Sequence, residues 1–146
     1  EKVTSGGGYA GIALDSTHVF WAWSEIGRAA KTGGGDQILA TAPSLAWCIA
    51  VDEGFAYWTN YIGIVERIPK TGGSPVEIAP SRYWRCLTLD ATHVYAVADG
   101  LAPGIYRFPK SGGSLEELSG AAGLDIAVDA DHLYWTSGSG VWRLAK

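Results

Sequence analysis

The chain repeats one four-residue motif four times, and this repetition constrains the fold more than any other feature. The motif is an apolar residue, a small residue, a second apolar residue and Asp, and successive aspartates lie 37, 38 and 39 positions apart. Its copies are Ile12–Asp15, Ile49–Asp52, Leu87–Asp90 and Ile126–Asp129. Internal periods in this range are typical of solenoids, propellers and other repeat arrays. The repeat therefore predicts a chain built from four similar units.

Each unit is predicted to contain four short strands. The first strand is the motif itself, and the second is an aromatic segment such as Ala56–Thr59. The third ends in Arg-x-x-Lys, as in Arg67–Lys70, and the Gly-Gly that follows is a hairpin signal because glycine adopts positive φ readily. A short fourth strand follows, as in Val76–Ile78. No segment holds a helical period, and repeated four-stranded units are the blades of a β-propeller.

The predicted domain is one all-β propeller of four four-stranded blades. The blades cover about residues 11–40, 48–79, 86–119 and 125–146, and residues 1–5 supply the fourth strand of the last blade. Val3 lies twelve positions before Asp15, as Ile78 lies twelve before Asp90, so the chain begins with a fourth strand. We expect residues 1–5 to pair beside the strand that ends at Lys146. The alternatives are a closed four-bladed ring within one chain, an eight-bladed ring of two chains, and a piece of a longer propeller.

The second unit resembles a known family. Its residues Ile49–Asp52, Tyr57–Asn60 and Arg67–Gly73 are similar to a blade of the Tyr-Trp-Thr-Asp (YWTD) propellers of low-density-lipoprotein receptors and their bacterial relatives. The four-residue signature is complete only here, with Asn60 in place of Asp, and is partial at Tyr134–Ser137. The resemblance implies a ligand- or protein-binding scaffold outside the cell, without catalysis.

Residues that recur in every unit are expected to support the fold. An Asp near a His suggests acid–base chemistry, but a catalytic pair is needed once, whereas a strand-connecting turn is needed in every blade. The aspartates are therefore predicted to cap turns, and the repeated tryptophans to pack between blades. These structural residues are Asp15, Asp52, Asp90, Asp129, His18, His93, His132, Trp21, Trp58 and Trp135.

Residues that do not recur are the candidate binding residues. Strands alternate in direction, so the turns after the second and fourth strands of each unit share one face, and there the sequence diverges. Variable loops on a rigid scaffold are where binding usually occurs. The cluster Arg82–Arg85 is the strongest, because Arg, Tyr and Trp are enriched in binding hot spots. The alternative is that Trp84 fills the channel and the arginines pair with Glu25 or Asp99. The candidates are Trp23, Glu25, Trp47, Asn60, Tyr61, Arg82, Tyr83, Trp84, Arg85 and Asp99.

Composition narrows the partners and the compartment. The net charge of −4 argues against a nucleic-acid-binding surface, and no apolar run is long enough to span a membrane. The chain has no Met, so we expect that it was processed or excised from something longer; a cleaved secretion signal would place it outside the cell or in the periplasm. Cys48 and Cys86 occupy equivalent positions in neighbouring units. The favoured interpretation is two small buried side chains, with a disulfide left open.

Three functions are compatible with these patterns. The favoured one is a non-catalytic interaction scaffold that presents its variable loop face to a protein partner or to copies of itself, with no cofactor and no metal. The second is a lectin that stacks sugars on its aromatic side chains. The third is a metal-dependent lyase or lactonase acting in the central channel, with loop carboxylates as ligands. No nucleophile elbow or phosphate-binding loop supports catalysis.

Overall fold

The computed structural model describes residues 2–4 and 10–146, which form four antiparallel sheets. Blade 1 contains β1 (Gly11–Leu14), β2 (His18–Ala22), β3 (Glu25–Ala30) and β4 (Gln37–Thr41). Blade 2 contains β5 (Ala46–Val51), β6 (Phe55–Asn60), β7 (Val65–Pro69) and β8 (Val76–Ala79). Blade 3 contains β9 (Tyr83–Leu89), β10 (His93–Asp99), β11 (Gly104–Pro109) and β12 (Glu116–Ser119). Blade 4 contains β13 (Asp125–Val128), β14 (His132–Ser137) and β15 (Gly140–Ala145). The prediction of an all-β chain is confirmed.

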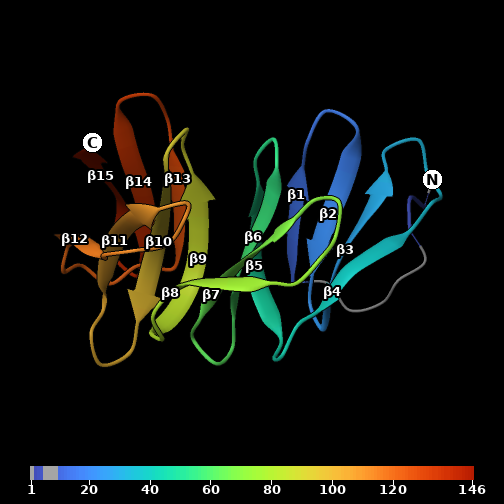
Figure 1. The fold of residues 1–146 in the computed structure, drawn as a ribbon. Coiled ribbons are helices and arrows are strands. Elements are labelled where there is room, and N and C mark those ends of the chain that lie inside the picture. The colour runs from blue at the N-terminus through green and yellow to red at the C-terminus, as the bar shows by residue number, and fades with distance from the viewer. Residues whose placement is uncertain (1, 5–9) are drawn as a thin grey trace.

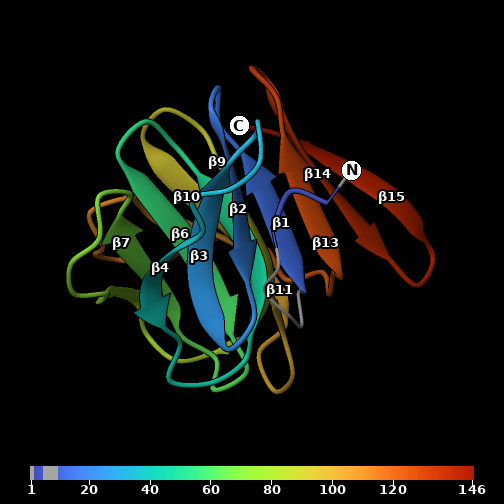
Figure 2. The ribbon, with the colours of Figure 1, turned by 90° about the vertical axis from the view of Figure 1, so that its right-hand side faces the viewer.

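The four blades stand in a row that follows the order of the sequence. The first strands of neighbouring blades are adjacent: β1 lies beside β5, β5 beside β9, and β9 beside β13 (Figure 1). Blade 1 and blade 4 occupy the two ends of this row, and Figure 2 views it from the blade 1 end. The described part of the chain thus forms an arc of blades, and it contains no helix long and apolar enough to cross a membrane.

The repeated aspartates stabilise the turns between the first and second strands by accepting hydrogen bonds. In every blade the aspartate that follows the first strand accepts hydrogen bonds from two backbone N–H groups of the next turn, as Asp52 does from Gly54 and Phe55 at 2.9 and 2.8 Å. The equivalent bonds at His18, His93 and His132 are 2.7–2.8 Å long. The Gly-Gly hairpins also form as predicted, with φ of 91° at Gly72 and 88° at Gly112.

The core lies between the blades. Each of the first three blades packs one face, which we call its front face, against the back face of the next blade. Between blades 3 and 4, for example, Tyr95 and Ile105 of the front face pack against Ile126 and Trp135 of the back face. The same arrangement joins blade 1 to blade 2 and blade 2 to blade 3. Both faces of the two middle blades are buried, which explains why β6 and β10 are apolar without alternation.

The ends of the chain differ from the closed ring favoured by the sequence. Blade 4 has three strands, and the described N-terminal residues do not lie beside β15. Instead, the carbonyl of Val3 accepts a hydrogen bond from Gly34 at 3.4 Å, and the Thr4 hydroxyl donates to Asp36 at 2.6 Å, both at the turn between β3 and β4 of blade 1. Residues 1 and 5 of the predicted strand lie outside the described residues. Closure within one chain is therefore not seen.

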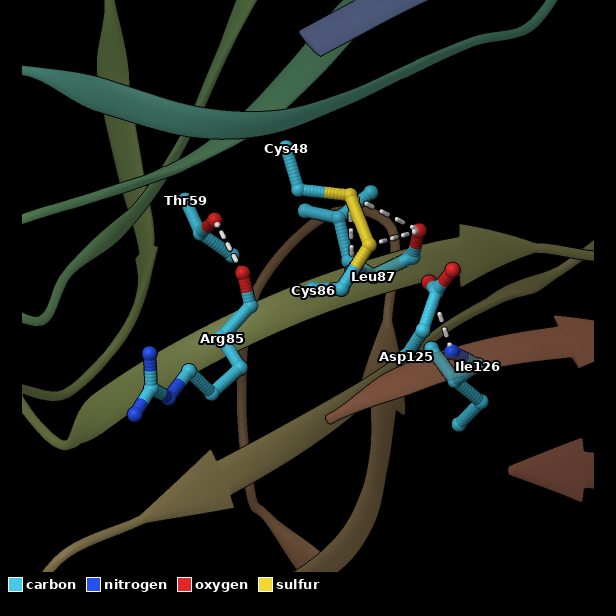
Figure 3. The surroundings of a disulfide bond; sticks show 7 residues. All are labelled: Cys48, Thr59, Arg85, Cys86, Leu87, Asp125 and Ile126. Carbon is cyan, nitrogen blue, oxygen red and sulfur yellow. Dashed lines mark hydrogen bonds between the residues drawn. A yellow bond between two sulfur atoms is a disulfide. The ribbon is translucent and has the colours of Figure 1, made fainter. Parts of the chain in front are cut away.

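Cys48 and Cys86 form a disulfide, so the interpretation as two unbonded side chains was wrong. The bond joins β5 to β9, whose Cα atoms are 5.1 Å apart at this point, and spans 38 positions of sequence (Figure 3). Beside it, the Thr59 hydroxyl donates to the Arg85 carbonyl at 3.2 Å, a second link between blades 2 and 3. The middle junction of the arc is thus joined covalently as well as by its core.

Candidate functional site

Three variable loops surround a cleft between blades 2 and 3. They are the turn from β6 to β7, the connection from β8 to β9, and the turn from β10 to β11, all on the face opposite the aspartate turns (Figure 1). The cleft consists of two adjoining hollows of about 710 and 380 Å³ that share Tyr61, Tyr83 and Asp99. We call it the loop cleft.

Two β-bulges turn side chains into the loop cleft. In β5, Ala46 pairs with Asn60 and Cys48 with Thr59, which leaves Trp47 as an extra residue. In β9, Trp84 pairs with Ala98 and Cys86 with Val97, which leaves Arg85 as the extra residue. A bulge bends its strand and redirects the side chain at that position. Trp47 and Arg85 accordingly line the smaller hollow.

Exposed aromatic side chains line the loop cleft. The rings of Trp47 and Tyr61 stack with centroids 6.0 Å apart, and Tyr83 is exposed on the neighbouring blade. Ile62 and the fully exposed Leu101 extend this surface over the larger hollow. Apolar groups gathered around a concavity on a protein surface usually mark an interaction site.

Hydrogen bonds hold the cleft loops in place. The backbone N–H of Arg82 donates to the Gly63 carbonyl at 2.7 Å, and the N–H of Tyr61 donates to the Leu45 carbonyl at 2.8 Å. Gly63 has a φ of 83°, and a Cβ there would lie 2.0 Å from the Arg82 carbonyl oxygen, so only glycine allows this approach. The loops are consequently fixed relative to the blades that carry them.

The charged groups at the cleft are engaged with neighbours. Arg85 donates two hydrogen bonds to Asp99, at 2.9 and 3.0 Å, as one of the sequence alternatives anticipated. The Arg82 guanidinium lies 4.5 Å from the ring centre of Tyr106 and donates to its hydroxyl at 3.2 Å. The hydrogen bonds from Arg85 and Gly100 lower the pKa of Asp99, which keeps the Arg85–Asp99 pair charged at neutral pH.

Two of the sequence candidates that line the smaller hollow are buried and hydrogen-bonded within the fold. Trp84 is buried, and its indole N–H donates to the Pro80 carbonyl at 3.1 Å. Asn60 is buried as well: its amide donates to Glu66 at 3.1 Å and accepts from the Ile64 N–H at 3.2 Å. The Trp84 ring forms one wall of the smaller hollow but has no free polar atom, and the polar atoms of Asn60 are occupied. Neither side chain offers a hydrogen bond to a ligand.

The remaining candidates divide between the cleft and another loop. Trp47, Tyr61, Arg82, Tyr83, Arg85 and Asp99 come together at the loop cleft. Trp23 lies in the turn between β2 and β3 of blade 1, Glu25 is the first residue of β3, and neither lines a hollow of the loop cleft. Sequence reasoning missed Ile62 and Leu101, although both are apolar residues in variable turns, which was an available signal.

Ion pairs link the aspartate turns of successive blades. The lysine that directly follows the third strand of one blade binds the aspartate of the preceding blade: Lys70 binds Asp15, Lys110 binds Asp52 at 3.0 Å, and Lys146 binds Asp90 at 3.3 Å. Burial alone would raise the pKa of these three carboxyls, but the lysine and turn hydrogen bonds together lower it. The groups are therefore charged and act as structural links.

Tyrosines complete the network around these aspartates. The Tyr57, Tyr95 and Tyr134 hydroxyls donate to the aspartate of their own blade at 2.9, 2.8 and 3.0 Å. Burial and the bond to Asp90 raise the pKa of Tyr95 to about 12, so the ring stays a neutral donor at physiological pH. The repeated Asp, Tyr and Lys thus bind one another around Asp52 and Asp90, whereas blade 1 has Phe20 in place of the tyrosine and Asp129 has a tyrosine but no lysine at its carboxylate among the described residues.

Comparison with known proteins supports the fold alone. No protein-family model matches the sequence, and neither does any curated protein. A chain of a nidogen/laminin complex is similar in structure with a TM-score of 0.81 and 21% identity, over 95% of this chain and 60% of that one. The computationally designed Ika4 protein matches with a TM-score of 0.79 and 12% identity, over 99% of this chain and 98% of that one. BamB from Moraxella catarrhalis matches with a TM-score of 0.72 and 14% identity, over 90% of this chain and 41% of that one.

The fold is that of a β-propeller. The resemblance to YWTD propellers is confirmed at the level of structure, and the chain spans less than two thirds of the nidogen/laminin chain that it matches. This propeller arc carries its divergent residues on one face and its repeated residues on the other.

Proposed function

We propose that this propeller is a non-catalytic interaction scaffold that binds a protein partner in the loop cleft. The observation that carries the proposal is the convergence of exposed Trp47, Tyr61, Tyr83 and Leu101 around one concavity on fixed loops. Large apolar side chains that are already ordered lose little conformational freedom on binding, so more of their burial appears as affinity.

The chemistry of the loop cleft favours a peptide segment over a small polar ligand. Its lining is mainly aromatic and aliphatic, and Asp99, which is paired with Arg85, lines both hollows. Apolar and aromatic side chains beside a few charged groups are typical of protein interfaces. Arg82 adds a cationic group whose contacts within the described residues are to Tyr106 and not to a carboxylate, which favours a partner segment carrying an acidic residue beside an apolar anchor.

The disulfide supports a location outside the reducing cytosol. Disulfides persist in secreted, periplasmic and cell-surface proteins and are rare in the cytosol of most cells. The Cys48–Cys86 bond joins two blades, so it belongs to the framework that positions the cleft. We propose an extracellular or periplasmic protein, in which this bond keeps the two cleft-bearing blades together.

We also propose that the arc is completed by further blades. An open end of a propeller exposes apolar blade faces of the kind that the inner junctions bury. Association with more blades covers these exposed faces. The N-terminal strand predicted to complete blade 4 would then lie beside the β15 edge of a neighbouring unit.

The binding proposal is tested with a displayed random-peptide library selected on the immobilised chain. The expected result is a set of convergent peptides whose affinity falls roughly tenfold or more with Tyr83→Ala or Leu101→Ala, because central anchors dominate binding energy. The matched control is Val76→Ala, which removes an exposed apolar side chain on β8 away from the cleft and should leave affinity unchanged.

Two results would overturn the proposal. One is a selection that enriches no common peptide; the other is enriched peptides that bind the Tyr83→Ala variant as tightly as the parent chain. A glycan array run in parallel separates the lectin alternative. Glycan binding that is lost with Tyr83→Ala, without peptide enrichment, would replace the protein partner with a carbohydrate.

A further inference from the structure

We propose that the blades which complete the ring belong to a second copy of this chain, and that Lys31 of each copy binds Asp129 of the other. The back face of blade 1 would then pack on the front face of blade 4 in the second copy. The inference deepens the proposed completion of the arc and is independent of ligand binding in the loop cleft, because the two sites share no residue.

Apolar residues at the two ends are exposed where their repeat equivalents are buried. On the back face of blade 1, Ile12 is 72% exposed, whereas Ile49, Leu87 and Ile126 at the same position are 3–7% exposed. Leu14, two residues further on, is exposed as well. The inner junctions bury this position against the front face of the preceding blade. Ile12 and Leu14 at the end of blade 1 thus have the exposure expected of a junction without the preceding blade, whereas Trp21, which pairs with Ile12, is buried.

The front face of blade 4 shows the complementary gap. Val141 is 74% exposed, whereas its equivalents Ile26, Val65 and Ile105 are fully buried against the following blade. A shallow hollow of about 190 Å³ lies here, lined in part by Ala127, Tyr134 and Val141. One end therefore offers protruding aliphatic side chains, and the other offers an apolar recess.

The lysine–aspartate pairs between neighbouring blades indicate how blade 1 of one copy would align with blade 4 of the other. Three lysines in succession each bind the aspartate of the preceding blade, in the pairs Lys70–Asp15, Lys110–Asp52 and Lys146–Asp90. Lys31 is the first member of the lysine series and is exposed. Asp129 is the last aspartate, and within the described residues its carboxylate accepts hydrogen bonds from Asp131, His132 and Tyr134. Lys146 donates to the backbone carbonyl of Asp129 at 3.0 Å, and no lysine binds its carboxylate among these residues. Within residues 2–4 and 10–146, Lys31 forms no ion pair with a carboxylate and Asp129 forms none with a lysine, and the two residues belong to the blades at the two ends of the arc.

At each inner junction the lysine also lies close to an aromatic ring of the preceding blade. Lys70 lies 5.3 Å from the ring centre of Phe20, and Lys110 and Lys146 lie 6.0 Å from those of Tyr57 and Tyr95. Tyr134 is the equivalent ring on blade 4, and its hydroxyl already donates to Asp129 at 3.0 Å. Lys31 of a second copy would meet a carboxylate and a ring arranged as at the three inner junctions.

Two copies give a closed assembly with two identical junctions. A head-to-tail contact forms a ring when its rotation closes, and a two-fold axis then relates the two arcs. This chain matches 41% of the larger BamB chain, 60% of the nidogen/laminin chain and 98% of the designed Ika4 chain, so propeller chains both of about this length and of more than twice this length exist. A ring of two arcs leaves neither Ile12 nor Val141 facing water.

The first test measures molar mass by light scattering during gel filtration. The expected mass is twice the 15.4 kDa of the chain. Lys31→Glu or Asp129→Lys, each alone, places like charges at both junctions and should shift the protein toward the single-chain mass. The control Glu53→Lys reverses an exposed charge in the β5–β6 turn of blade 2 and should leave the mass unchanged.

Mixing the two variants provides the decisive experiment. In a pair formed by one Lys31→Glu chain and one Asp129→Lys chain, one junction brings the introduced glutamate opposite the introduced lysine. The other junction keeps the original Lys31 and Asp129. Both junctions are attractive, so mixing should restore the doubled mass, although neither variant forms it alone. Closure within a single chain would show no such recovery.

Two results would overturn the inference. One is a parent chain that remains at 15.4 kDa up to high micromolar concentration; the other is a doubled mass that survives both charge reversals and Ile12→Asp. Circular dichroism of each variant shows whether the strands are retained, so that loss of mass is not mistaken for unfolding. A doubled mass without peptide binding in the loop cleft would support this inference while rejecting the cleft proposal.

Discussion

The junction between blades 2 and 3 and the open faces of blades 1 and 4 are built from the same repeat but have opposite surroundings. At the inner junction, Tyr57 and Val65 of blade 2 pack against Leu87 and Phe108 of blade 3. At the open ends, the equivalent Val141 and Ile12 face solvent. The residue types are nearly the same, so the difference lies in whether a neighbouring blade is present.

This contrast shows what the repeat encodes. Every unit carries the side chains needed to pack on a unit before it and a unit after it, and nothing in the motif marks a first or last blade. Repeat proteins usually need a polar outer face on their terminal units to remain soluble. Blades 1 and 4 keep the apolar pattern instead, which is the physical reason to expect that their open faces are covered.

The largest expected difference concerns equivalent residues on the two kinds of face. Ile105→Ala should lower the free energy of unfolding by about 2–5 kcal/mol, because it leaves a cavity in a packed junction. Val141→Ala should change it by less than about 0.5 kcal/mol in the separated chain. Urea denaturation at a concentration where light scattering finds single chains measures both values. Equal losses would contradict the assignment of Val141 to an open face.

The disulfide should make the next largest contribution. Replacing Cys48 and Cys86 together with serine should lower the free energy of unfolding by about 2–4 kcal/mol, because the unfolded chain loses its crosslink. Thermal denaturation of the parent chain with and without reductant gives an independent measure. The same reductant applied to the serine variant is the control and should have no effect. An unchanged midpoint on reduction would show that the bond does not stabilise this junction.

Much of the fold was predictable from the sequence because it depends on local chemistry. The period fixes the blades, glycine supplies the positive φ of the hairpins at Gly72 and Gly112, and Asp52 has its turn partners within three residues. The separation of variable and repeated loops onto opposite faces follows from strand alternation alone. These features need no knowledge of how blades pack.

The features that the sequence did not predict depend on how the blades and their strands lie relative to one another. Spacing in the sequence does not say how far apart Cys48 and Cys86 lie, and the structure brings their Cα atoms to 5.1 Å. The two bulges were also not predictable, since an extra residue in a strand leaves no local signature here. Because of these bulges, Trp47 and Arg85 line the cleft while Trp84 enters the core.

The smallest expected difference separates a paired aspartate from an open one through its pH dependence. The pKa of Asp52 is lowered in the folded chain, because the bonds from Lys110, Phe55, Tyr57 and Gly54 outweigh its burial. A lowered folded pKa contributes stability above the unfolded value of about 4, and this contribution is lost as pH falls below it. Asp52→Asn should therefore cost roughly 1 kcal/mol at pH 7 and less near pH 3.

The matched variant is Asp129→Asn, which alters the same position on the open face. Backbone bonds from Asp131 and His132 lower the pKa of Asp129, but no lysine contributes. In the separated chain this variant should therefore cost less than Asp52→Asn at pH 7. At concentrations where two chains form a ring, Lys31 of the second copy supplies the missing cation and the two costs should approach each other. Urea titrations at pH 7 and pH 3, each at a low and a high protein concentration, measure four values for each variant. A cost for Asp129→Asn that does not rise with protein concentration would mean that this aspartate remains unpaired in the assembled protein.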